Sequence, residues 1–539
     1  MVEISMVEGN WDYIIVGGGS AGCVLANRLS ANHKNHVLLL DAGVNDHGPS
    51  LHIPAGMMSA ISNDKYNWKY PAAPDASRGG VPDLWSAGKA IGGGSAINGM
   101  LYIRGHSSDF DGWVQSGCKG WDYDSVLPHF KSLESFEGGA DEYRNHNGPQ
   151  SVAFERSRLN IVEQFMKAAV DCGHPRNLDY NGKSQTGVGY SQNSQKDGRR
   201  HSTASAFLNP VRQRKNLKVV MGAHVKRAVI KNGKAKGVAY RFKGQDFIAD
   251  CRGEIIISAG ALSSPKLLMH SGIGPSDILS SNDIHIHKDS SQVGRNLMEH
   301  PAVYLTAKTK TKSLNAAAHP LRLPFVLADW LFRGRGAASA PAASAQVLCR
   351  SDERLVAPDI QLLLTPAIFD YDLDKKKAVV LPDNGVSIAA LLLNPTSRGQ
   401  VIITSPDPLA PPLIEHELLG TKEDITGMVG ATKKAVEIFS CDRLSETVTS
   451  REPGLTPQSS DDEFEKYVRS TAFRGDHASG TCRMGSDDKA VLDPQLRVRG
   501  ISGLRVVDAS IMPKITSGNT NAPTLMIAEK AASMILAAE

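Results

Sequence analysis

The sequence has few features of membrane, secreted or nucleic-acid-binding proteins. Its 539 residues contain no uninterrupted run of about 18 apolar side chains, so we expect no membrane-spanning helix. The first ten residues carry acids and no apolar stretch of signal-peptide length. The 60 Lys and Arg against 56 Asp and Glu leave a net charge of only +4, which predicts that nucleic acid is not a partner.

Cysteine is also scarce. The seven cysteines are odd in number, widely separated and never spaced as CxxC, which disfavours both a disulfide framework and a zinc site. We therefore expect no metal and a reducing, cytoplasmic location. The hydrophobic fraction of 41% and charged fraction of 22% are typical of a folded globular protein, and the length predicts two domains.

The N-terminal region has the pattern of a βαβ unit. Residues 12–16 (DYIIV) and 37–40 are short apolar runs that predict parallel strands, and residues 20–30 between them have helical spacing. Gly17, Gly19 and Gly22 form GxGxxG where the first strand meets the helix. Such a unit predicts an α/β fold that binds a dinucleotide.

Each glycine of this motif has a physical role. Gly17 makes the tight turn, Gly19 lets the backbone approach a pyrophosphate, and Gly22 lets the helix pack on the strand. The helix start supplies free N–H groups to the phosphates. Asp41 ends the second strand, where it can accept hydrogen bonds from ribose hydroxyls. No arginine stands beside Asp41, which favours FAD or NAD over NADP.

Three distant segments extend the same domain. Residues 254–258 and 504–508 predict further strands, and residues 524–536 predict a C-terminal helix. The cofactor domain is therefore predicted to be discontinuous and Rossmann-like, within an α+β protein overall. Strand-like runs at 387–393 and 400–404 favour an antiparallel sheet in the second domain. The predicted FAD-binding domain comprises residues 1–50, 85–110, 215–300 and 490–539, and the predicted substrate-binding domain and cap segments comprise 51–84, 111–214 and 301–489.

Five segments occur in the order found in one known family. They are residues 88–105 (GKAIGGGSAINGMLYIRG), 259–274 (AGALSSPKLLMHSGIG), 293–300 (VGRNLMEH), 477–485 (HASGTCRMG) and 504–524 (LRVVDASIMPKITSGNTNAPT). In these segments the chain resembles the glucose-methanol-choline (GMC) oxidoreductases. The likeness is nearest to bacterial FAD-dependent alcohol dehydrogenases and to oxidases of aryl alcohols or hydroxymethylfurfural. The resemblance implies FAD-dependent oxidation of an alcohol at its CH–OH group by hydride transfer.

The resemblance also assigns residues to the cofactor. Asn98 is carried over as a flavin contact, and Asp508 as a contact of the ribityl and phosphate part. Members that bind FAD covalently have a histidine just before this asparagine, and this chain has Ile97, so we expect non-covalent FAD. The predicted cofactor-binding residues are Gly17, Gly19, Ser20, Ala21, Gly22, Asp41, Ala42, Gly92, Gly94, Ser95, Asn98, Gly99, Met100, Val225, Asp508, Ala509, Asn521, Ala522 and Thr524.

The resemblance further implies a catalytic pair. His477 begins HASGTCRMG, where the family has its catalytic histidine, and Asn521 matches a position that is histidine or asparagine in other members. An asparagine amide does not titrate usefully, so the general base falls to His477 and Asn521 orients the hydroxyl. Asn521 could instead be a plain helix N-cap. Asp476 replaces the usual aromatic residue, and it would raise the pKa of His477 if it pointed into the site.

Substrate and partners follow from the same comparison. Choline-oxidising members have an acid where this chain has Ala302, which favours a neutral primary alcohol, aliphatic or aryl. The electron acceptor is oxygen or a quinone, and an oxygen-using aryl or furanic alcohol oxidase and an FAD-containing lyase remain alternatives. Residues 321–336 mix aromatic residues with arginines and could touch a membrane, but a helix packed on the protein is the preferred interpretation. We expect a monomer or homodimer.

Overall fold

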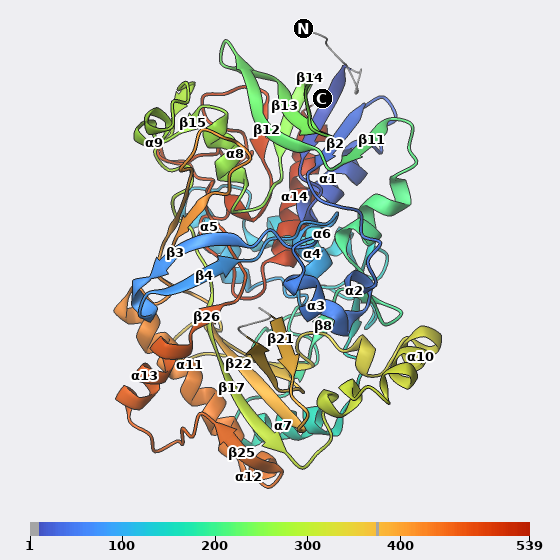
Figure 1. Cartoon of the computed structure of the whole chain (residues 1–539), viewed down its shortest axis with the longest axis vertical. Coiled ribbons are helices and arrows are strands. Elements are labelled where there is room, and N and C mark those ends of the chain that lie inside the picture. The colour runs from blue at the N-terminus through green and yellow to red at the C-terminus, as the bar shows by residue number, and fades with distance from the viewer. Residues whose placement is uncertain (1–9, 373–376, 539) are drawn as a thin grey trace.

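The computed structural model describes residues 10–372 and 377–538. Two sheets organise it, a largely parallel one in the upper half of Figure 1 and an antiparallel one in the lower half. Of the first ten residues, for which we expect no signal peptide, only residue 10 is among the described residues. Among the described residues, no helix is both long and apolar enough to cross a membrane.

The upper sheet is the predicted dinucleotide-binding sheet. Its order is β11–β2–β1–β14–β13–β12, and β27 pairs with β14. Strands β11, β2, β1, β14 and β27 are parallel, and β12, β13 and β14 form an antiparallel meander. All four strand predictions for this domain are confirmed. The strands are β1 Trp11–Val16, β2 Val37–Asp41, β11 Leu217–Met221, β12 His224–Lys231, β13 Lys234–Phe242, β14 Gln245–Ile257 and β27 Leu504–Val506.

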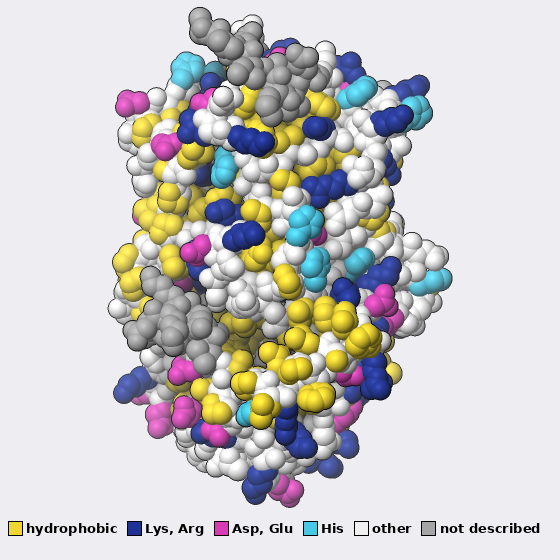
Figure 2. Space-filling model, turned by 45° about the vertical axis from the view of Figure 1, so that its right-hand side comes forward, with side chains coloured by type: hydrophobic (Ala, Val, Ile, Leu, Met, Phe, Trp, Pro, Cys, Tyr) yellow, Lys and Arg dark blue, Asp and Glu magenta, His cyan; other side chains and the backbone are white. Residues whose placement is uncertain are grey.

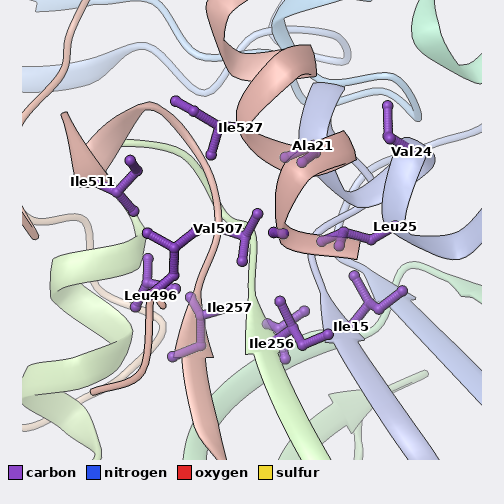
Figure 3. Close-up of a cluster of buried hydrophobic side chains, with 14 of the residues drawn as sticks. Ile15, Ala21, Val24, Leu25, Ile256, Ile257, Leu496, Val507, Ile511 and Ile527 are labelled. Atoms are coloured by element: carbon purple, nitrogen blue, oxygen red, sulfur yellow. The ribbon is translucent and has the colours of Figure 1, made fainter. Parts of the chain in front are cut away.

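Two helices cover the parallel part of this sheet. Helix α1 (Ser20–Leu29) follows β1, and α14 (Asn521–Leu536) packs against α1 and α6 (Tyr123–Leu133). The predicted C-terminal helix is thus confirmed but begins three residues earlier. Figure 3 shows part of the resulting core, a single buried cluster that includes Leu25 and Ile527 from the two helices and Ile15 and Ile256 from adjacent strands. Segments some 500 residues apart therefore share one core and fix the cofactor edge of the sheet.

The lower sheet is antiparallel, as predicted. Its order is β25–β17–β22–β19–β18–β7, and β26 pairs with β17. Helices α7, α11 and α13 cover its outer face, and the inner face is turned toward the upper domain. The elements are β7 Gly187–Tyr190, β17 Pro301–Thr309, β18 Ala345–Cys349, β19 Ile360–Thr365, β22 Gly385–Leu392, β25 Val448–Glu452, β26 Phe473–Arg474, α7 Asn160–Asp171, α11 Lys422–Ser440 and α13 Asp461–Thr471.

A third sheet of four strands contains one strand that was predicted for the antiparallel sheet of the second domain. The run at 400–404 forms β23 (Gln400–Ile402), but this strand joins β24 (Leu413–Glu415), β3 (Tyr70–Asp75) and β4 (Val81–Trp85) rather than the substrate sheet. The remaining helices are α2 Pro49–His52, α3 Met57–Ser62, α4 Gly94–Ile97, α5 Ser107–Gln115, α8 Ser264–His270, α9 Ser276–Ser281, α10 Leu323–Arg333 and α12 Asp442–Ser445. The remaining strands are β5 Glu134–Phe136, β6 Gln150–Phe154, β8 Gln192–Asn193, β9 Gln195–Lys196, β10 Arg199–Arg200, β15 Ile273–Gly274, β16 Lys288–Asp289, β20 Phe369–Asp372 and β21 Lys377–Val380.

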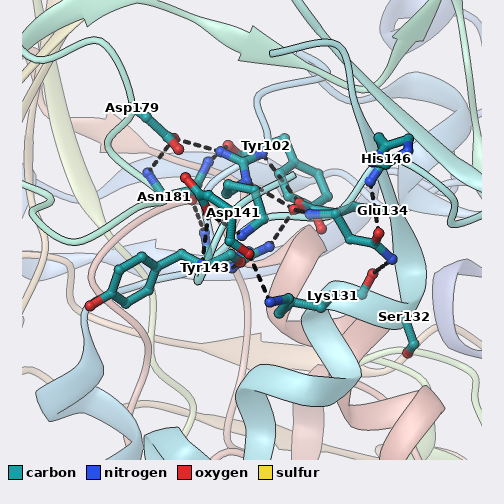
Figure 4. Close-up of polar contacts among 12 residues, drawn as sticks. Tyr102, Lys131, Ser132, Glu134, Asp141, Tyr143, His146, Asp179 and Asn181 are labelled. Carbon is teal, nitrogen blue, oxygen red and sulfur yellow. Dashed lines mark hydrogen bonds and ion pairs between the residues drawn. The ribbon is translucent and has the colours of Figure 1, made fainter. Parts of the chain in front are cut away.

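A buried ion network anchors the chain just after the Gly92–Ser95 loop (Figure 4). The Glu134 carboxylate is fully buried and pairs with Arg104 at 2.6 Å and with Arg144 at 2.8 Å. Asn181 accepts from the Arg104 backbone N–H and donates to the Tyr102 carbonyl, each across 2.8–2.9 Å. Because each buried charge has partners, the network holds residues 102–104, and with them the preceding loop, in one position.

Candidate active site

A cavity of about 1060 Å³ lies between the two domains. Its upper wall is the carboxyl edge of the parallel sheet with the starts of α1 and α14, and its lower wall is the inner face of the antiparallel sheet. Open α/β sheets bind ligands at this edge. The volume exceeds what a small alcohol needs and leaves room for a large cofactor beside it.

The glycine loop after β1 has the geometry that its proposed roles require. Gly17 has a φ of 103°, and a Cβ there would lie 2.5 Å from the Ser258 carbonyl oxygen. A Cβ on Gly22 would lie 1.9 Å from the Gly17 carbonyl oxygen, so the helix can approach the strand only without one. A Cβ on Gly19 would meet no other atom within 3.9 Å, which leaves this backbone open to the cavity. No side chain caps the start of α1, so its first N–H groups are available to an anion.

Asp41 has a second role. Its two carboxylate oxygens accept backbone N–H groups of Gly18 and Gly43, both at 2.7 Å. Burial raises the pKa of this carboxyl. Each oxygen keeps a further lone pair for a ribose hydroxyl, and the residue lines the cavity.

The second glycine loop is held from behind by a buried arginine. Arg200 donates from Nη1 to the Asn98 carbonyl at 2.7 Å and to the Asn98 side-chain oxygen at 2.9 Å. Ser95 turns its hydroxyl into the protein, where it donates to the Gly92 carbonyl at 2.6 Å. Burial lowers the pKa of Arg200 to about 9. The loop thus presents backbone to the cavity, while its side chains fix its shape.

The candidate base belongs to a directed chain of hydrogen bonds. His300 Nε2 lies 3.0 Å from the Leu393 carbonyl oxygen, and His300 Nδ1 lies 3.0 Å from His477 Nδ1. The carbonyl can only accept, so His300 carries its hydrogen on Nε2 and accepts on Nδ1. His477 must then carry its hydrogen on Nδ1. Its Nε2 therefore carries a lone pair and acts as a hydrogen-bond acceptor at the cavity wall.

Two interactions hold this histidine pair in place. The buried Glu299 carboxylate accepts the backbone N–H of His477 at 2.8 Å and that of His300 at 2.8 Å. Burial raises the pKa of Glu299 to about 8. Beside it, β26 pairs with the first residues of β17, which joins the two histidine-bearing segments. Glu299 was not predicted from sequence, because a lone acid within VGRNLMEH carries no local signal of burial.

His477 is poised to be neutral. Burial alone lowers its pKa to about 4, and 8% of its surface remains exposed. Asp476 has a φ of 60° and turns its carboxylate to Arg474, with Oδ1 3.2 Å from Nη1. A carboxylate of Asp476 pointing at His477 would raise the pKa of His477. The pKa of His477 is instead lowered. The substitution of an acid for the usual aromatic residue therefore does not charge the histidine.

The structure places Asn519, not Asn521, against His477. Asn519 Nδ2 donates to His477 Nε2 at 2.9 Å, and its side-chain oxygen accepts from Gln361 at 3.3 Å. Asn521 instead accepts the Ser20 hydroxyl at 2.7 Å and so joins α14 to α1. The N-cap of α14 is Thr520, so the alternative that Asn521 is the N-cap is wrong. Both asparagines line the cavity.

The wall opposite the glycine loops comes from the antiparallel sheet. Ala302 and Tyr304 of β17 lie in register with Leu391 and Ala389 of β22, so all four point to the same face. Phe473 stacks on Tyr304 with ring centres 4.5 Å apart. These residues form an apolar wall near His477. Ala302 was singled out from sequence, but Tyr304, Ala389, Leu391 and Phe473 were not, because alternation identifies a strand but not what its face contacts.

Most predicted site residues surround the cavity. Those that line it are Gly17, Gly19, Ser20, Ala21, Asp41, Ala42, Gly94, Asn98, Gly99, Met100, Val225, His477, Asp508, Ala509, Asn521 and Thr524. Behind this lining lie Gly22, Gly92, Ser95 and Ala522. Asp508 accepts the Gly260 N–H at 2.9 Å and the Ser264 hydroxyl, so it also closes the carboxyl end of β14 onto β27. In the part of the chain that the structure describes, no cluster of His, Cys, Asp or Glu could hold a metal ion.

Comparison with known proteins agrees with this geometry. Family models for GMC oxidoreductases match residues 11–302 and 395–528. The chain belongs to the GMC oxidoreductase family. It is 36% identical to an oxygen-dependent choline dehydrogenase of Vibrio vulnificus, covering 98% of this chain and 95% of that one. It is 36% identical to an alcohol dehydrogenase [acceptor] of Pseudomonas putida, covering 98% and 96%. The solved pyridoxine 4-oxidase from Mesorbium loti superposes with a TM-score of 0.88 at 30% identity, covering 97% and 99%.

As a GMC oxidoreductase, the protein is a flavoenzyme that acts on CH–OH donors. The cavity fits FAD on its own evidence. Ser258 Oγ is buried at the cavity wall without a partner among the described residues. The starts of α1 and α14 both lack a side-chain cap. Gly17–Gly22 and Asp41 would hold the adenosine and pyrophosphate part, and the loop through Asn98 and the start of α14 would hold the flavin.

We expect acid precipitation of the purified yellow protein to release its FAD. Ile97 stands where tethered members have histidine, and its aliphatic side chain is buried with Leu51, Ala60 and Tyr66. It offers no atom that could bond covalently to the flavin. The absorbance of the supernatant and pellet at the flavin maximum measures the release. A yellow pellet after denaturation would contradict the prediction.

Proposed function

We propose that this protein oxidises a neutral primary alcohol, aliphatic or aryl, to the aldehyde. His477 acts as the general base and Asn519 orients the hydroxyl. The observation that carries the proposal is the unprotonated Nε2 of His477, which the hydrogen-bond chain through His300 to Leu393 fixes as an acceptor at the cavity wall beside the Asn519 amide. FAD, when bound, accepts the hydride from the alcohol carbon.

The protein's own residues handle the hydroxyl. Asn519 Nδ2 lies 2.9 Å from His477 Nε2. A substrate hydroxyl that replaces this contact would receive a hydrogen bond from the amide and give one to the imidazole. The hydroxyl proton then passes to Nε2 as the C–H bond breaks. His300, which accepts from His477 Nδ1, steadies the imidazolium that forms. The low pKa of His477 keeps it neutral, and so able to accept this proton, at neutral pH.

The lining supports a neutral substrate. Position 302 is alanine, and its neighbours Tyr304, Leu391 and Phe473 are apolar or aromatic. The charged pair of Arg474 and Asp476 is internally neutralised at 3.2 Å. The relatives that are named choline dehydrogenases leave choline as the competing substrate, but an apolar wall favours an alkyl or aryl group over a hydrated cation.

Anaerobic addition of alcohols to the purified holoprotein tests the proposal. We expect 1-butanol or benzyl alcohol to bleach the flavin absorbance, because an apolar wall binds their carbon chains or rings. Choline should bleach it at least about tenfold more slowly at equal concentration, since no acid at position 302 meets its ammonium group. Faster bleaching by choline would contradict the neutral-alcohol assignment. No bleaching by any alcohol would favour a lyase.

We propose that the reduced enzyme passes its electrons to a quinone or artificial dye rather than to oxygen. The support is the 36% identity to an alcohol dehydrogenase [acceptor]. Fold and cofactor do not by themselves fix the acceptor. Stoichiometric hydrogen peroxide, formed as fast as the flavin is reduced, would instead establish the alternative, an aryl or furanic alcohol oxidase.

A further inference from the structure

Helix α10 (Leu323–Arg333) shows its apolar face to solvent. The sequence favoured a helix packed on the protein. That interpretation is wrong about burial, because Trp330 is the one residue of α10 that is buried. Phe325 is 77% exposed, Phe332 82%, and Leu321, just before the helix, 78%. Figure 2 shows hydrophobic side chains gathered in the lower half of the side that carries α10, with Lys and Arg beside them.

Helical geometry explains how one residue anchors the helix while the others point away. At about 100° per residue, Phe325 and Phe332 are seven positions apart and share a face, whereas Trp330 lies about 140° from Phe325. Trp330 points inward, where its Nε1 donates to the Gly198 carbonyl at 2.8 Å and Arg199 lies over its ring. The two phenylalanines therefore form an outward ridge, the α10 ridge, together with Leu321.

The charges around the α10 ridge are mainly positive. The exposed or partly exposed charged residues on or next to α10 and in the β9–β10 hairpin are Lys196, Arg199, Arg322, Arg333 and Arg335, with the acids Asp197 and Asp329. Asp329 is shared by Arg333 and Arg335, at 3.4 and 4.0 Å. A helix that exposes Phe and Leu beside arginines has the composition of an interfacial helix that lies in the headgroup region of an anionic membrane.

We propose that the α10 ridge docks this enzyme onto an anionic lipid surface. A second copy of the chain fits less well, because a twofold contact would bring two basic flanks against each other. Helix α10 also projects from the side of the molecule (Figure 1). Helix α10 packs on the turn at Ala337–Ser339, which contacts Pro54–Gly56, next to the cavity-lining Met57. Docking there would bring the membrane to the side of the protein on which Met57 lines the cavity, without using a catalytic residue.

Cosedimentation of the holoprotein with lipid vesicles tests the proposal. We expect binding to vesicles of equal parts phosphatidylglycerol and phosphatidylcholine, and much weaker binding to phosphatidylcholine alone or at high salt. The double variant Phe325→Ser, Phe332→Ser should lower the partition coefficient at least about tenfold. The matched control Leu178→Ser, Val356→Ser removes two side chains of similar exposure, 78% and 77%, and should bind as the wild type does.

Each outcome decides the matter. Loss of binding in the Phe variant alone, with unchanged flavin content and melting temperature, supports the proposal. Equal binding of the wild type and the Phe variant, equal loss in both double variants, or no wild-type binding to the anionic vesicles overturns it. Light scattering is the remaining check, because a wild-type dimer that the Phe substitutions dissociate would assign the ridge to contact between copies and would also overturn the proposal.

Discussion

Replacing His477 with alanine should slow anaerobic flavin reduction by roughly 100-fold or more, the usual scale for a lost acid–base catalyst. The loss follows because, among the described residues, no other neutral imidazole reaches the cavity wall near Asn519. His300 is fully buried, and its Nε2 donates to the Leu393 carbonyl. FAD should remain bound, since the glycine loops that would hold it lie on the other side of the cavity. Stopped-flow reduction by the best alcohol, with flavin content measured in parallel, checks both parts.

His270→Ala is the matched control. This histidine is also buried, 7% exposed, and burial likewise lowers its pKa to about 4, but it does not line the cavity. Its loss should change the reduction rate by less than about threefold. In the wild type, kcat/KM should stay constant as pH falls past the ordinary histidine pKa of 6.5 and decline only near 4, because the neutral form persists to the lowered pKa. A decline of kcat/KM near pH 6.5, or flavin reduction in His477→Ala as fast as in the wild type, would show that another residue is the base.

The predictions that succeeded rest on local patterns. The strands at 12–16 and 37–40 and the glycines between them are specified within one short βαβ unit, and Gly17 and Gly22 admit no Cβ where the structure has them. The pairing of His300 with His477 joins residues 177 apart. No periodicity reports such a contact, because it depends on how β26 lies along β17.

The prediction that α10 packs on the protein failed for a related reason. An apolar and aromatic sequence at 323–333 predicts a helix, and the helix is there. Which face is covered depends on the neighbouring turn at Gly198, which contacts Trp330 and leaves Phe325 and Phe332 outside. Amphipathic spacing gives the angle between faces but not the side on which the rest of the protein lies.

The choice between Asn519 and Asn521 shows how sharply a helix start matters. The segment Asn519-Thr520-Asn521 offers two asparagines, and α14 begins at the second, with Thr520 as its N-cap. Asn521 is therefore carried on the first turn, where it faces α1 and Ser20. Asn519 precedes the helix, and its side-chain amide contacts His477. Asparagine side chains two residues apart, one before the start of α14 and one in its first turn, therefore point to different partners. Composition alone does not locate the start of the helix.

Asn519→Ala should therefore slow flavin reduction by about 100-fold, the scale found when a single hydrogen-bond donor to a reacting oxygen is removed. Asn521→Ala should slow it by less than about tenfold, and it should weaken FAD retention instead, because it removes the acceptor of the Ser20 hydroxyl between α1 and α14. Ser20→Ala combined with Asn521→Ala should then cost little more than either alone, since both remove the same bond.

A conservative replacement separates orientation of the substrate from a merely structural role of Asn519. Asn519→His keeps an N–H donor beside His477 Nε2, so it should recover part of the rate that Asn519→Ala loses. A structural role would instead make alanine the milder change, since a larger ring must fit where the amide meets Gln361. If Asn521→Ala slows reduction more than Asn519→Ala while FAD stays bound, the orienting role returns to Asn521, and the contact between Asn519 and His477 serves only to hold the free base in position.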